Sequence, residues 1–368
     1  MLKPVDLRHY LHSNPELMFQ EFKTTKILID NISGLEGIKI HRPLETGLVA
    51  EYTVNSEPYI LFRGDIDALP IKEDTGYPWK SNNDYMHACG HDVHTSALYG
   101  FLLNVVEKRP DQNLLFLFQP AEEGGGGAVK TIESGVFDSF NISKAIALHV
   151  TDDYKRGEIA TSPGVLFASA CEINIEFRGK SAHVAFPEKG INSFDGLRSF
   201  LDKIQAWLKN QNERLIFGYG KVESGVARNI IPYYTKAECT LRALSYEKNM
   251  EFLEKVSELL KQTEAETGVK AEILRGPAFS EVVVDEKVYN ECVPALSSKF
   301  KVIDCGSKMT GEDFGFISKK YPSLMFWIGT SNGENHGLHT PHFLPADDSI
   351  QDCIDAFSLI LNKETENL

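Results

Sequence analysis

Residues 114–127 read Leu-Leu-Phe-Leu-Phe-Gln-Pro-Ala-Glu-Glu-Gly-Gly-Gly-Gly, an apolar run that leads directly into two carboxylates and four glycines. The run predicts a buried strand over 114–118. Charges at the end of a buried strand need a partner or a metal, so Glu122 and Glu123 are candidate site residues. Because neighbouring side chains point in different directions, one can bind a metal while the other faces a water. The glycines indicate close backbone approach, since no Gly-x4-Gly-Lys-Ser/Thr pattern of a phosphate loop follows.

Strand-like and helical segments alternate on both sides of this strand. The expected strands include 48–52, 59–62 and 145–149, and the expected helices include 5–12, 22–32 and 94–107. This alternation predicts an α/β fold with a mostly parallel sheet flanked by helices. From about residue 168 the pattern is that of an independent α+β module, and the α/β pattern resumes after Gly276-Pro277. We therefore expect a first domain built from 1–167 and 276–368, with a module of 168–275 inserted in it.

The composition is that of a folded, acidic protein. Of 368 residues, 42% are hydrophobic and 24% are charged, and 38 basic against 52 acidic side chains give a net charge of −14. That balance argues against a nucleic-acid partner. With no apolar leader and no run long enough to span a membrane, we expect a soluble, cytosolic protein. Six cysteines spread over this length do not form a disulfide framework, and we expect most of them to be buried thiols.

A second candidate site lies in Met86-His-Ala-Cys-Gly-His-Asp-Val-His94. Thiolate and imidazole are ligands of borderline divalent metals, and Cys89 and His91, two residues apart, can reach one centre from a loop. The alternative is a helix start with Asp92 near its N-terminus and histidines packed around it. Two further imidazoles, His149 at the end of an expected strand and His339 near the C-terminus, favour the metal site when taken together with Glu123.

Five motifs, in their order along the chain, resemble those of the metal-dependent amidohydrolases of the M20 peptidase family: Arg63-Gly-Asp-Ile-Asp-Ala-Leu-Pro70, Met86-His-Ala-Cys-Gly-His-Asp92, Gln119-Pro-Ala-Glu-Glu123, Leu148-His-Val150 and Leu338-His-Thr-Pro341. The branch is that of aminoacylases, hippurate hydrolases and plant auxin-conjugate hydrolases. The inserted module shares the resemblance at Gly179-Lys-Ser-Ala-His183 and Ala227-Arg-Asn229. Within the branch, Glu73-Asp-Thr-Gly-Tyr-Pro78 and Met309-Thr-Gly-Glu-Asp-Phe314 are similar to bacterial N-acetyldiaminopimelate deacetylases.

The resemblance implies a zinc-peptidase-like catalytic domain with two divalent ions per subunit, drawn from Zn, Mn, Co or Ni. Their implied ligands are Cys89, His91, Glu123, His149 and His339. Glu122 is the implied general base, which would take a proton from water and give it to the leaving amine. Asp67 aligns with a second active-site acid that maintains the geometry of the metal site, and either Asp65 or Asp67 is placed to orient a metal-binding histidine. Which ligand bridges the metals stays open, as does the role of Asp65.

The inserted module corresponds by resemblance to a lid and dimerisation domain, which implies a homodimer or a larger homo-oligomer. His183 would stabilise the developing oxyanion, and its alternative is a capping or core histidine. Asn229 is a candidate oxyanion donor, while Arg228 or Arg242 would pair with a substrate carboxylate. Glu312 would bind a substrate ammonium, or else act as a first-turn acid in a helix capped by Thr310.

The motifs are compatible with three functions. The first is hydrolysis of N-acetyl-L,L-diaminopimelate to L,L-diaminopimelate and acetate, and the second is the same chemistry on another N-acyl amino acid, hippurate or a dipeptide. The third is a metal-binding protein on an inactive hydrolase scaffold. The presence of both Glu122 and Glu123 argues against the third, because a binding module needs no free base beside a ligand.

Overall fold

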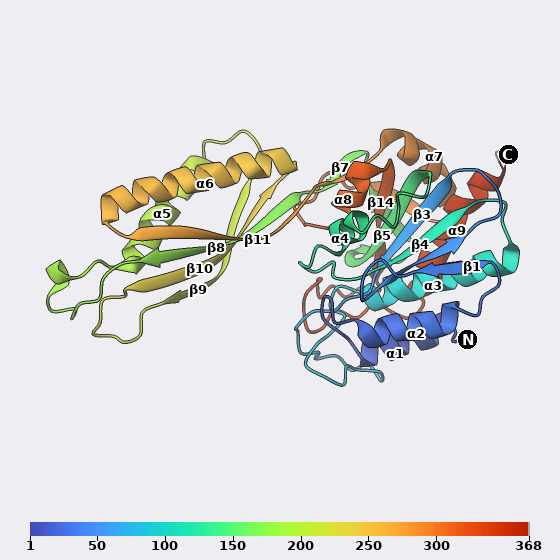
Figure 1. Ribbon diagram of the computed structural model, residues 1–368, viewed down its shortest axis with the longest axis horizontal. Helices are drawn as coiled ribbons and strands as arrows, with labels where there is room; N and C mark the ends of the chain where they lie inside the picture. Colours follow the sequence, from blue (N-terminus) through green and yellow to red (C-terminus); the bar gives the residue numbers. More distant parts are fainter. Residues whose placement is uncertain (367–368) are drawn as a thin grey trace. The chain divides into compact units, whose positions relative to one another are not determined.

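The computed structural model describes residues 1–366 and divides the chain into two compact units (Figure 1). Unit 1 comprises residues 1–166, 282–307 and 313–368, and unit 2 comprises 167–281 together with 308–312. The segment predicted as an inserted module, 168–275, lies within unit 2. The structure adds Phe167 and residues 276–281 to that unit, since strand β11 continues to Phe279. It also adds the short segment 308–312, whose Lys308 and Thr310 carbonyls accept from the Ala168 N–H.

Unit 1 contains an eight-stranded mixed sheet with the order β1-β2-β4-β3-β5-β14-β6-β13. Its central strands β4, β3, β5 and β14 pair in parallel, as the α/β pattern predicts. The strands are β1 (Ile38–His41), β2 (Leu48–Tyr52), β3 (Tyr59–Asp65), β4 (Leu114–Gln119), β5 (Ile142–Lys155), β6 (Glu158–Thr161), β13 (Lys301–Asp304) and β14 (Ser323–Ser331). A separate pair joins β7 (Gly164–Phe167) to β12 (Val282–Val284).

Helices in two groups pack with this sheet. In the first group α3 contacts α1 and α9, and α7 also contacts α9, while α4 packs with α8 in the second group. The helices are α1 (Pro4–Ser13), α2 (Phe22–Ile32), α3 (His91–Lys108), α4 (Gly127–Glu133), α7 (Glu286–Leu296), α8 (Gly315–Lys320) and α9 (Ser349–Glu366). All six residues of β4 are buried, which agrees with its reading as an apolar core strand.

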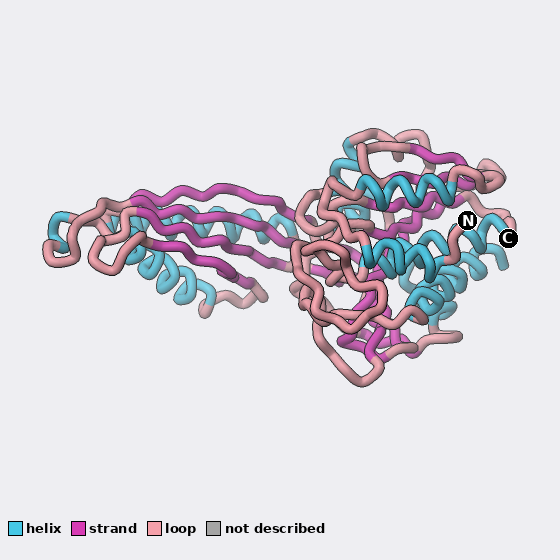
Figure 2. Tube along the Cα trace, turned by 90° about the horizontal axis from the view of Figure 1, so that it is seen from below, coloured by secondary structure: helices cyan, strands magenta, loops and turns pink. Residues whose placement is uncertain are grey.

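Unit 2 is a four-stranded antiparallel sheet with the order β11-β8-β10-β9 and two long helices along it (Figure 2). Its elements are β8 (Ser169–Arg178), η1 (Pro187–Lys189), α5 (Ser193–Leu208), β9 (Ile216–Ser224), β10 (Tyr234–Ala243), α6 (Tyr246–Thr267) and β11 (Lys270–Phe279). Alternate residues of β8 and β10 are buried, and they form a core with the apolar faces of α5 and α6. Unit 2 therefore has a hydrophobic core of its own.

Two local expectations are wrong. His149 does not end its strand, because β5 continues to Lys155 by pairing with β14; His149 is instead level with the end of β3, whose Arg63 is opposite Ala147. The reading of Glu312 as a first-turn acid also fails. Helix α8 begins at Gly315, and the Thr310 carbonyl accepts a hydrogen bond from the Ala168 backbone instead of starting a helix.

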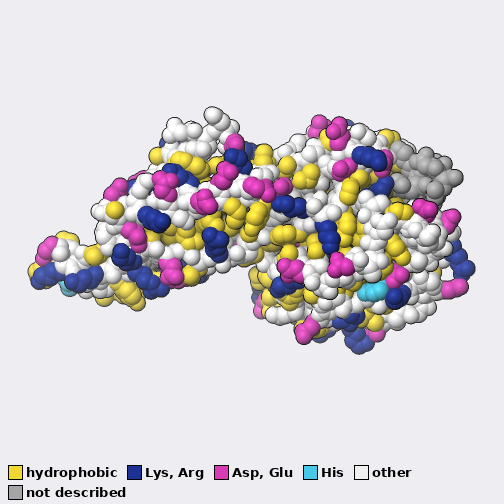
Figure 3. Space-filling model, turned by 45° about the horizontal axis from the view of Figure 1, so that its top comes forward, with side chains coloured by type: hydrophobic (Ala, Val, Ile, Leu, Met, Phe, Trp, Pro, Cys, Tyr) yellow, Lys and Arg dark blue, Asp and Glu magenta, His cyan; other side chains and the backbone are white. Residues whose placement is uncertain are grey.

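The surface and the thiols agree with the composition. On the face shown in Figure 3, lysine and arginine side chains are interspersed with aspartate and glutamate. All six cysteines are free and five of them are buried, as expected. Among residues 1–366, no helix combines the length and the apolar character that a membrane crossing requires.

Candidate metal centre

The predicted metal ligands of unit 1 come from four places near the carboxyl ends of its parallel strands. Cys89 and His91 flank Gly90, whose φ of +82° precedes helix α3, and Glu123 lies in the turn after β4. His149 lies on β5, and His339 belongs to the loop after β14. Because β3, β4, β5 and β14 are parallel, their carboxyl ends meet at one edge of the sheet.

The structure brings all five of these side chains together. The Cys89 Sγ lies 3.3 Å from the Nε2 of His149 and 3.2 Å from the Nε2 of His339. The Glu123 Oε1 is 3.2 Å from the His339 Nε2 and 3.9 Å from the Nε2 of His91. Cys89, His91 and His149 form one group of potential ligand atoms, and Cys89, Glu123 and His339 form another. Two groups that share a thiol suit two adjacent cations.

Two unsatisfied atoms test whether this donor set fits a metal. The Nε2 of His91 and the Oε1 of Glu123 are buried and have no hydrogen-bond partner within residues 1–366. Leaving a buried polar atom unpaired costs about 1–3 kcal/mol. Both atoms are electron-pair donors suited to a divalent cation, and they lie 3.9 Å apart. The set of thiolate, imidazole and carboxylate therefore fits a divalent metal.

Carboxylates and backbone carbonyls orient the imidazoles. The Nδ1 of His91 lies 3.0 Å from the Asp67 carbonyl oxygen and 3.2 Å from the Asp67 Oδ1, which leaves its Nε2 facing the site. The Nδ1–H of His149 donates to the Val150 carbonyl at 2.7 Å, so its Nε2 faces Cys89. Such contacts to the far nitrogen of an imidazole fix its tautomer and its ring orientation.

The protonation of the ligands depends on the same carboxylates. Burial and the charge of Glu123 raise the pKa of the Cys89 thiol well above its usual range. Burial alone would lower the pKa of His91, yet Asp65 and Asp67 raise it to about 10. Since a ligand must lose its proton to coordinate, binding of a divalent cation would release protons from this site.

Asp65 has a different environment. It is fully buried, it pairs with Arg63 at 2.6 Å, and it accepts a hydrogen bond of 2.6 Å from the Nδ1 of His94. The Nε2 of His94 in turn accepts from the Val150 backbone N–H at 2.9 Å. Burial opposes the charge of Asp65, but His91 and Arg63 hold its pKa well below its usual range. Asp65 thus ties β3 to α3 and β5 beside the ligands.

Three buried carboxylates hold the turn that carries Glu122 and Glu123. Glu21 accepts from the Ala121 N–H at 2.8 Å, Asp67 from the Glu123 N–H at 3.0 Å, and Asp313 from the Ala128 N–H at 2.9 Å. Ala121 has a φ of +55°, a left-handed conformation that is unfavourable for a residue with a Cβ. The turn is therefore strained and held from several sides.

Glycines allow this turn to close, as their spacing predicts. A Cβ on Gly127 would lie 1.6 Å from the Pro120 carbonyl oxygen, a distance that no side chain could tolerate. The Gly127 N–H instead donates to the Ala121 carbonyl at 3.1 Å. The position requires glycine because two stretches of backbone meet there.

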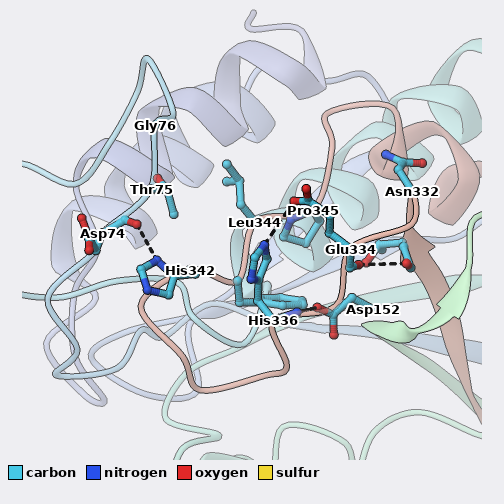
Figure 4. Close-up of a pocket in the computed structure, with 13 residues that line it drawn as sticks. Asp74, Thr75, Gly76, Asp152, Asn332, Glu334, His336, His342, Leu344 and Pro345 are labelled. Carbon is cyan, nitrogen blue, oxygen red and sulfur yellow. Dashed lines mark hydrogen bonds and ion pairs between the residues drawn. The ribbon is translucent and has the colours of Figure 1, made fainter.

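A cavity of about 480 Å³ opens in unit 1 beside the loop that carries His339 (Figure 4). His336 and His342 both line it. The Nδ1–H of His342 donates to the Asp74 carbonyl at 2.6 Å, and Asp152 accepts from the His336 backbone N–H at 2.6 Å. These contacts connect the loop after β14 to the rest of unit 1.

The remaining candidate residues belong to unit 2. His183, Arg228 and Asn229 are exposed, and the Val184 N–H donates to the Asn229 carbonyl at 3.2 Å, which brings the His183 and Asn229 segments side by side. Arg242 pairs with Glu172 at 3.3 Å. Glu312 is buried in the segment 308–312. The exposure of His183 speaks against its alternative as a core histidine.

The sequence reasoning missed Glu21 and Asp313. No local pattern marks Glu21, which is 100 residues away from the backbone that it holds. Asp313 lies in the motif Thr310-Gly-Glu-Asp-Phe314, in which nothing but its position distinguishes it from the neighbouring Glu312. Asp313 also accepts from Gln119 at 2.7 Å and from Arg63 at 3.1 Å, contacts that only the fold reveals.

Comparisons with known proteins agree with this geometry. Residues 61–363 match the model of a family described as Peptidase family M20/M25/M40. The chain is 37% identical over 352 residues to N-acetyldiaminopimelate deacetylase of Exiguobacterium sibiricum, covering 94% of this chain and 95% of that protein. It is 33% identical over 368 residues to the protein of the same name from Bacillus pumilus, covering 98% of this chain and 97% of that one. A Bacillus subtilis structure described as a dinuclear metal binding peptidase from the M20 family superposes with a TM-score of 0.80 at 28% identity, covering 99% of this chain and 98% of that chain.

Proposed function

Since the chain belongs to the peptidase family M20/M25/M40 and is a metal-binding amidohydrolase of that family, we propose that its substrate is N-acetyl-L,L-diaminopimelate. The products would be L,L-diaminopimelate and acetate, a step in the acetylated branch of lysine biosynthesis. The names of the two relatives, at 37% and 33% identity over nearly the whole chain, support this substrate. The chemistry rests on one observation, the convergence of five side chains with potential metal-ligand atoms beside Glu122.

In this proposal Cys89, His91, Glu123, His149 and His339 hold two divalent ions, of Zn, Mn, Co or Ni. When bound, the ions would polarise the amide carbonyl and lower the pKa of the attacking water towards about 7. Cys89 belongs to both groups and would be one of the residues that hold the ions. Asp67 keeps the Nε2 of His91 turned into the site.

Glu122 acts as the general base. Its carboxylate is buried beside the ligands, with Oε2 3.9 Å from the Nε2 of His91, and it follows the strained Ala121 directly. It takes a proton from the attacking water and returns that proton to the leaving amino group. Glu123, the next residue, has its Oε1 3.2 Å from the Nε2 of His339. In the proposal Glu123 therefore binds metal while Glu122 transfers the proton.

The proposal extends to unit 2 as a lid and dimerisation domain. His183 and Asn229 would donate to the developing oxyanion, Arg228 would pair with a substrate carboxylate, and Glu312 would bind its ammonium group. Strand β9 lies at an edge of the unit 2 sheet and carries exposed apolar side chains, including Tyr219 and Val222. An exposed edge of this kind favours pairing with a second chain, which supports a homodimer.

The same chemistry on another N-acyl amino acid is the second candidate. Only the substrate would differ, since the ligand set and Glu122 serve any amide bond. Release of acetate from N-acetyl-L,L-diaminopimelate, measured with added Mn, Co or Zn beside hippurate and N-acetyl-methionine, separates the two. Cleavage of hippurate without formation of diaminopimelate would refute the proposed substrate.

Two substitutions test the residue roles on whichever substrate the protein cleaves. Glu122→Gln should lower kcat by about 100-fold or more while the metal content stays the same, because the base is lost and the ligands remain. Glu107→Gln, the same change on the exposed face of α3, is the matched control. Cys89→Ala should lower the bound metal per chain. Turnover that survives Glu122→Gln, or metal content that survives Cys89→Ala, would remove these assignments.

A further inference from the structure

Glu21 is a buried carboxylate that holds the turn before Glu122, and the proposed mechanism gives it no part in the reaction itself. The side chain of Glu21 is fully buried, and its carboxylate oxygen Oε2 has no hydrogen-bond partner among residues 1–366. Burying a carboxylate is expensive unless it is paired or hydrogen-bonded. A residue kept at that cost needs a reason in the structure.

Capping of the adjacent helix is not that reason. Glu21 occupies the N-cap position of α2, yet its side chain makes no capping hydrogen bond. Glu16 performs the capping instead, since its carboxylate accepts from the N–H groups of Lys23 at 3.1 Å and Thr24 at 2.9 Å. The carboxylate of Glu21 is thereby left for a different partner.

That partner is the backbone directly before the general base. The Oε1 of Glu21 accepts a hydrogen bond of 2.8 Å from the Ala121 N–H, 100 residues away in sequence. Ala121 holds a φ of +55°, a left-handed conformation that is unfavourable for a residue with a Cβ. The hydrogen bond from the Ala121 N–H opposes that strain, while burial and the nearby Asp67 raise the pKa of Glu21 to about 7.

The segment around Glu21 is itself anchored to the site. The Ala68 N–H donates to the Glu16 carbonyl at 2.8 Å, and Leu17 forms a bridge with Ala68, the residue after Asp67. Residues 16–21 therefore connect the Asp67 segment, which orients His91, to the turn that carries Glu122. A shift of Glu122 relative to His91 would therefore strain or break the hydrogen bonds that segment 16–21 makes with Ala68 and Ala121.

We propose that Glu21 is a positioning residue for Glu122: its carboxylate holds the left-handed Ala121 and so fixes the direction in which the base points. The inference rests on the proposed role of Glu122. It assigns Glu21 an effect on turnover without loss of bound metal, because Glu21 holds the backbone before Glu122, whereas the N–H of Glu123 is held by Asp67.

The test compares two substitutions of similar size. Glu21→Gln keeps an acceptor oxygen for the Ala121 N–H, whereas Glu21→Met fills the space without one. We expect Glu21→Met to lower kcat by about 10- to 100-fold with KM and bound metal unchanged, since an ångström of misplacement costs up to about 100-fold. Glu21→Gln should stay within about threefold of the unaltered protein. Should Glu21→Met fail to fold, Glu21→Asp replaces it, because the shorter carboxylate keeps its charge but falls short of Ala121.

Asp285→Ala is the control for loss of helix capping, because Asp285 caps α7 by accepting from the N–H groups of Lys287 and Val288. It should lower the melting temperature while leaving kcat unchanged. Equal kcat in the Met, Gln and unaltered proteins would overturn the proposal. So would a loss of kcat that follows loss of metal, or a Gln variant as impaired as the Met variant. All assays use an N-acyl amino acid that the unaltered protein cleaves, so the outcome is independent of the natural substrate. Full activity of Glu122→Gln would separately show that the assigned base is wrong.

Discussion

Replacement of Gly127 by alanine tests whether the closed turn after β4 places the catalytic carboxylate. The new Cβ would lie 1.6 Å from the Pro120 carbonyl oxygen, whereas real Cβ contacts do not fall below 3.0 Å. The two backbone segments must therefore separate by about 1.4 Å to reach that limit. Glu122 and Glu123 lie between these segments, so the displacement passes directly to the base and to a ligand.

The expected cost has two parts. Overpacking of this kind destabilises a fold by about 1–3 kcal/mol. Misplacement of a reacting group by an ångström lowers turnover by about 100-fold. We therefore expect Gly127→Ala to remain folded with a lower melting temperature and to lose about 100-fold in kcat.

The assay is steady-state hydrolysis with metal in excess, combined with thermal unfolding and a count of bound metal per chain. Gly34→Ala is the matched control, because Gly34 has no positive φ and no atom within 4 Å of an added Cβ. A Gly127→Ala protein with unchanged kcat and melting temperature would refute the argument that this close approach sets the geometry of the base.

Three further predictions concern other parts of the chain. Burial alone would lower the pKa of His12, but hydrogen bonds to Asp92 and Glu73 raise it to about 9. The protonated His12 should therefore add up to about 3 kcal/mol to the free energy of unfolding below pH 6.5, and this contribution should be lost as the pH rises to 9. Urea unfolding of the unaltered and His12→Gln proteins should show a difference in unfolding free energy that shrinks over this range. A difference that stays constant with pH would contradict the prediction. Dialysis against a chelator should abolish hydrolysis and lower the melting temperature, and addition of Mn, Co or Zn should restore both. Full activity of the metal-free protein would contradict the prediction. Phe200→Ala in the core of unit 2 should destabilise that unit by about 3–5 kcal/mol. The metal bound per chain should not change, because the proposed ligands lie in unit 1. Loss of metal in this variant would contradict the independence of the two units.

Much of the fold follows from local pattern. Helix α2 and strand β2 have the predicted bounds, and β4 differs by one residue, because amphipathic and apolar runs of those lengths leave little choice. The end of strand β5 does not follow from local pattern. Residues 150–155 include Asp152 and Asp153, which are typical of turns, and only pairing with β14 extends the strand through them. Short strands such as β6 and β12 also depend on their partners, and the sequence does not mark them.

The site divides in the same way. Residues that bind metal are recognisable from chemistry, because cysteine, histidine and adjacent glutamates in short motifs serve few other purposes. Residues that hold the site through backbone contacts are not recognisable, because any carboxylate can accept from an N–H. Glu21 and Asp313 are of this second kind, and their partners are 100 and 185 residues away.

The buried carboxylates of unit 1 can be sorted by what their oxygens contact. Glu21, Asp67 and Asp313 each accept from a backbone N–H of the turn, and such contacts fix a position. Glu123 instead has its Oε1 without a hydrogen bond in the described chain, and its carboxylate lies near the imidazoles of His91 and His339 and the thiol of Cys89. The open oxygen faces groups with which it could share a cation, as the proposed role of Glu123 as a metal ligand requires, and leaving it unpaired costs stability. The carboxylates that accept from the backbone around it are what hold it in place.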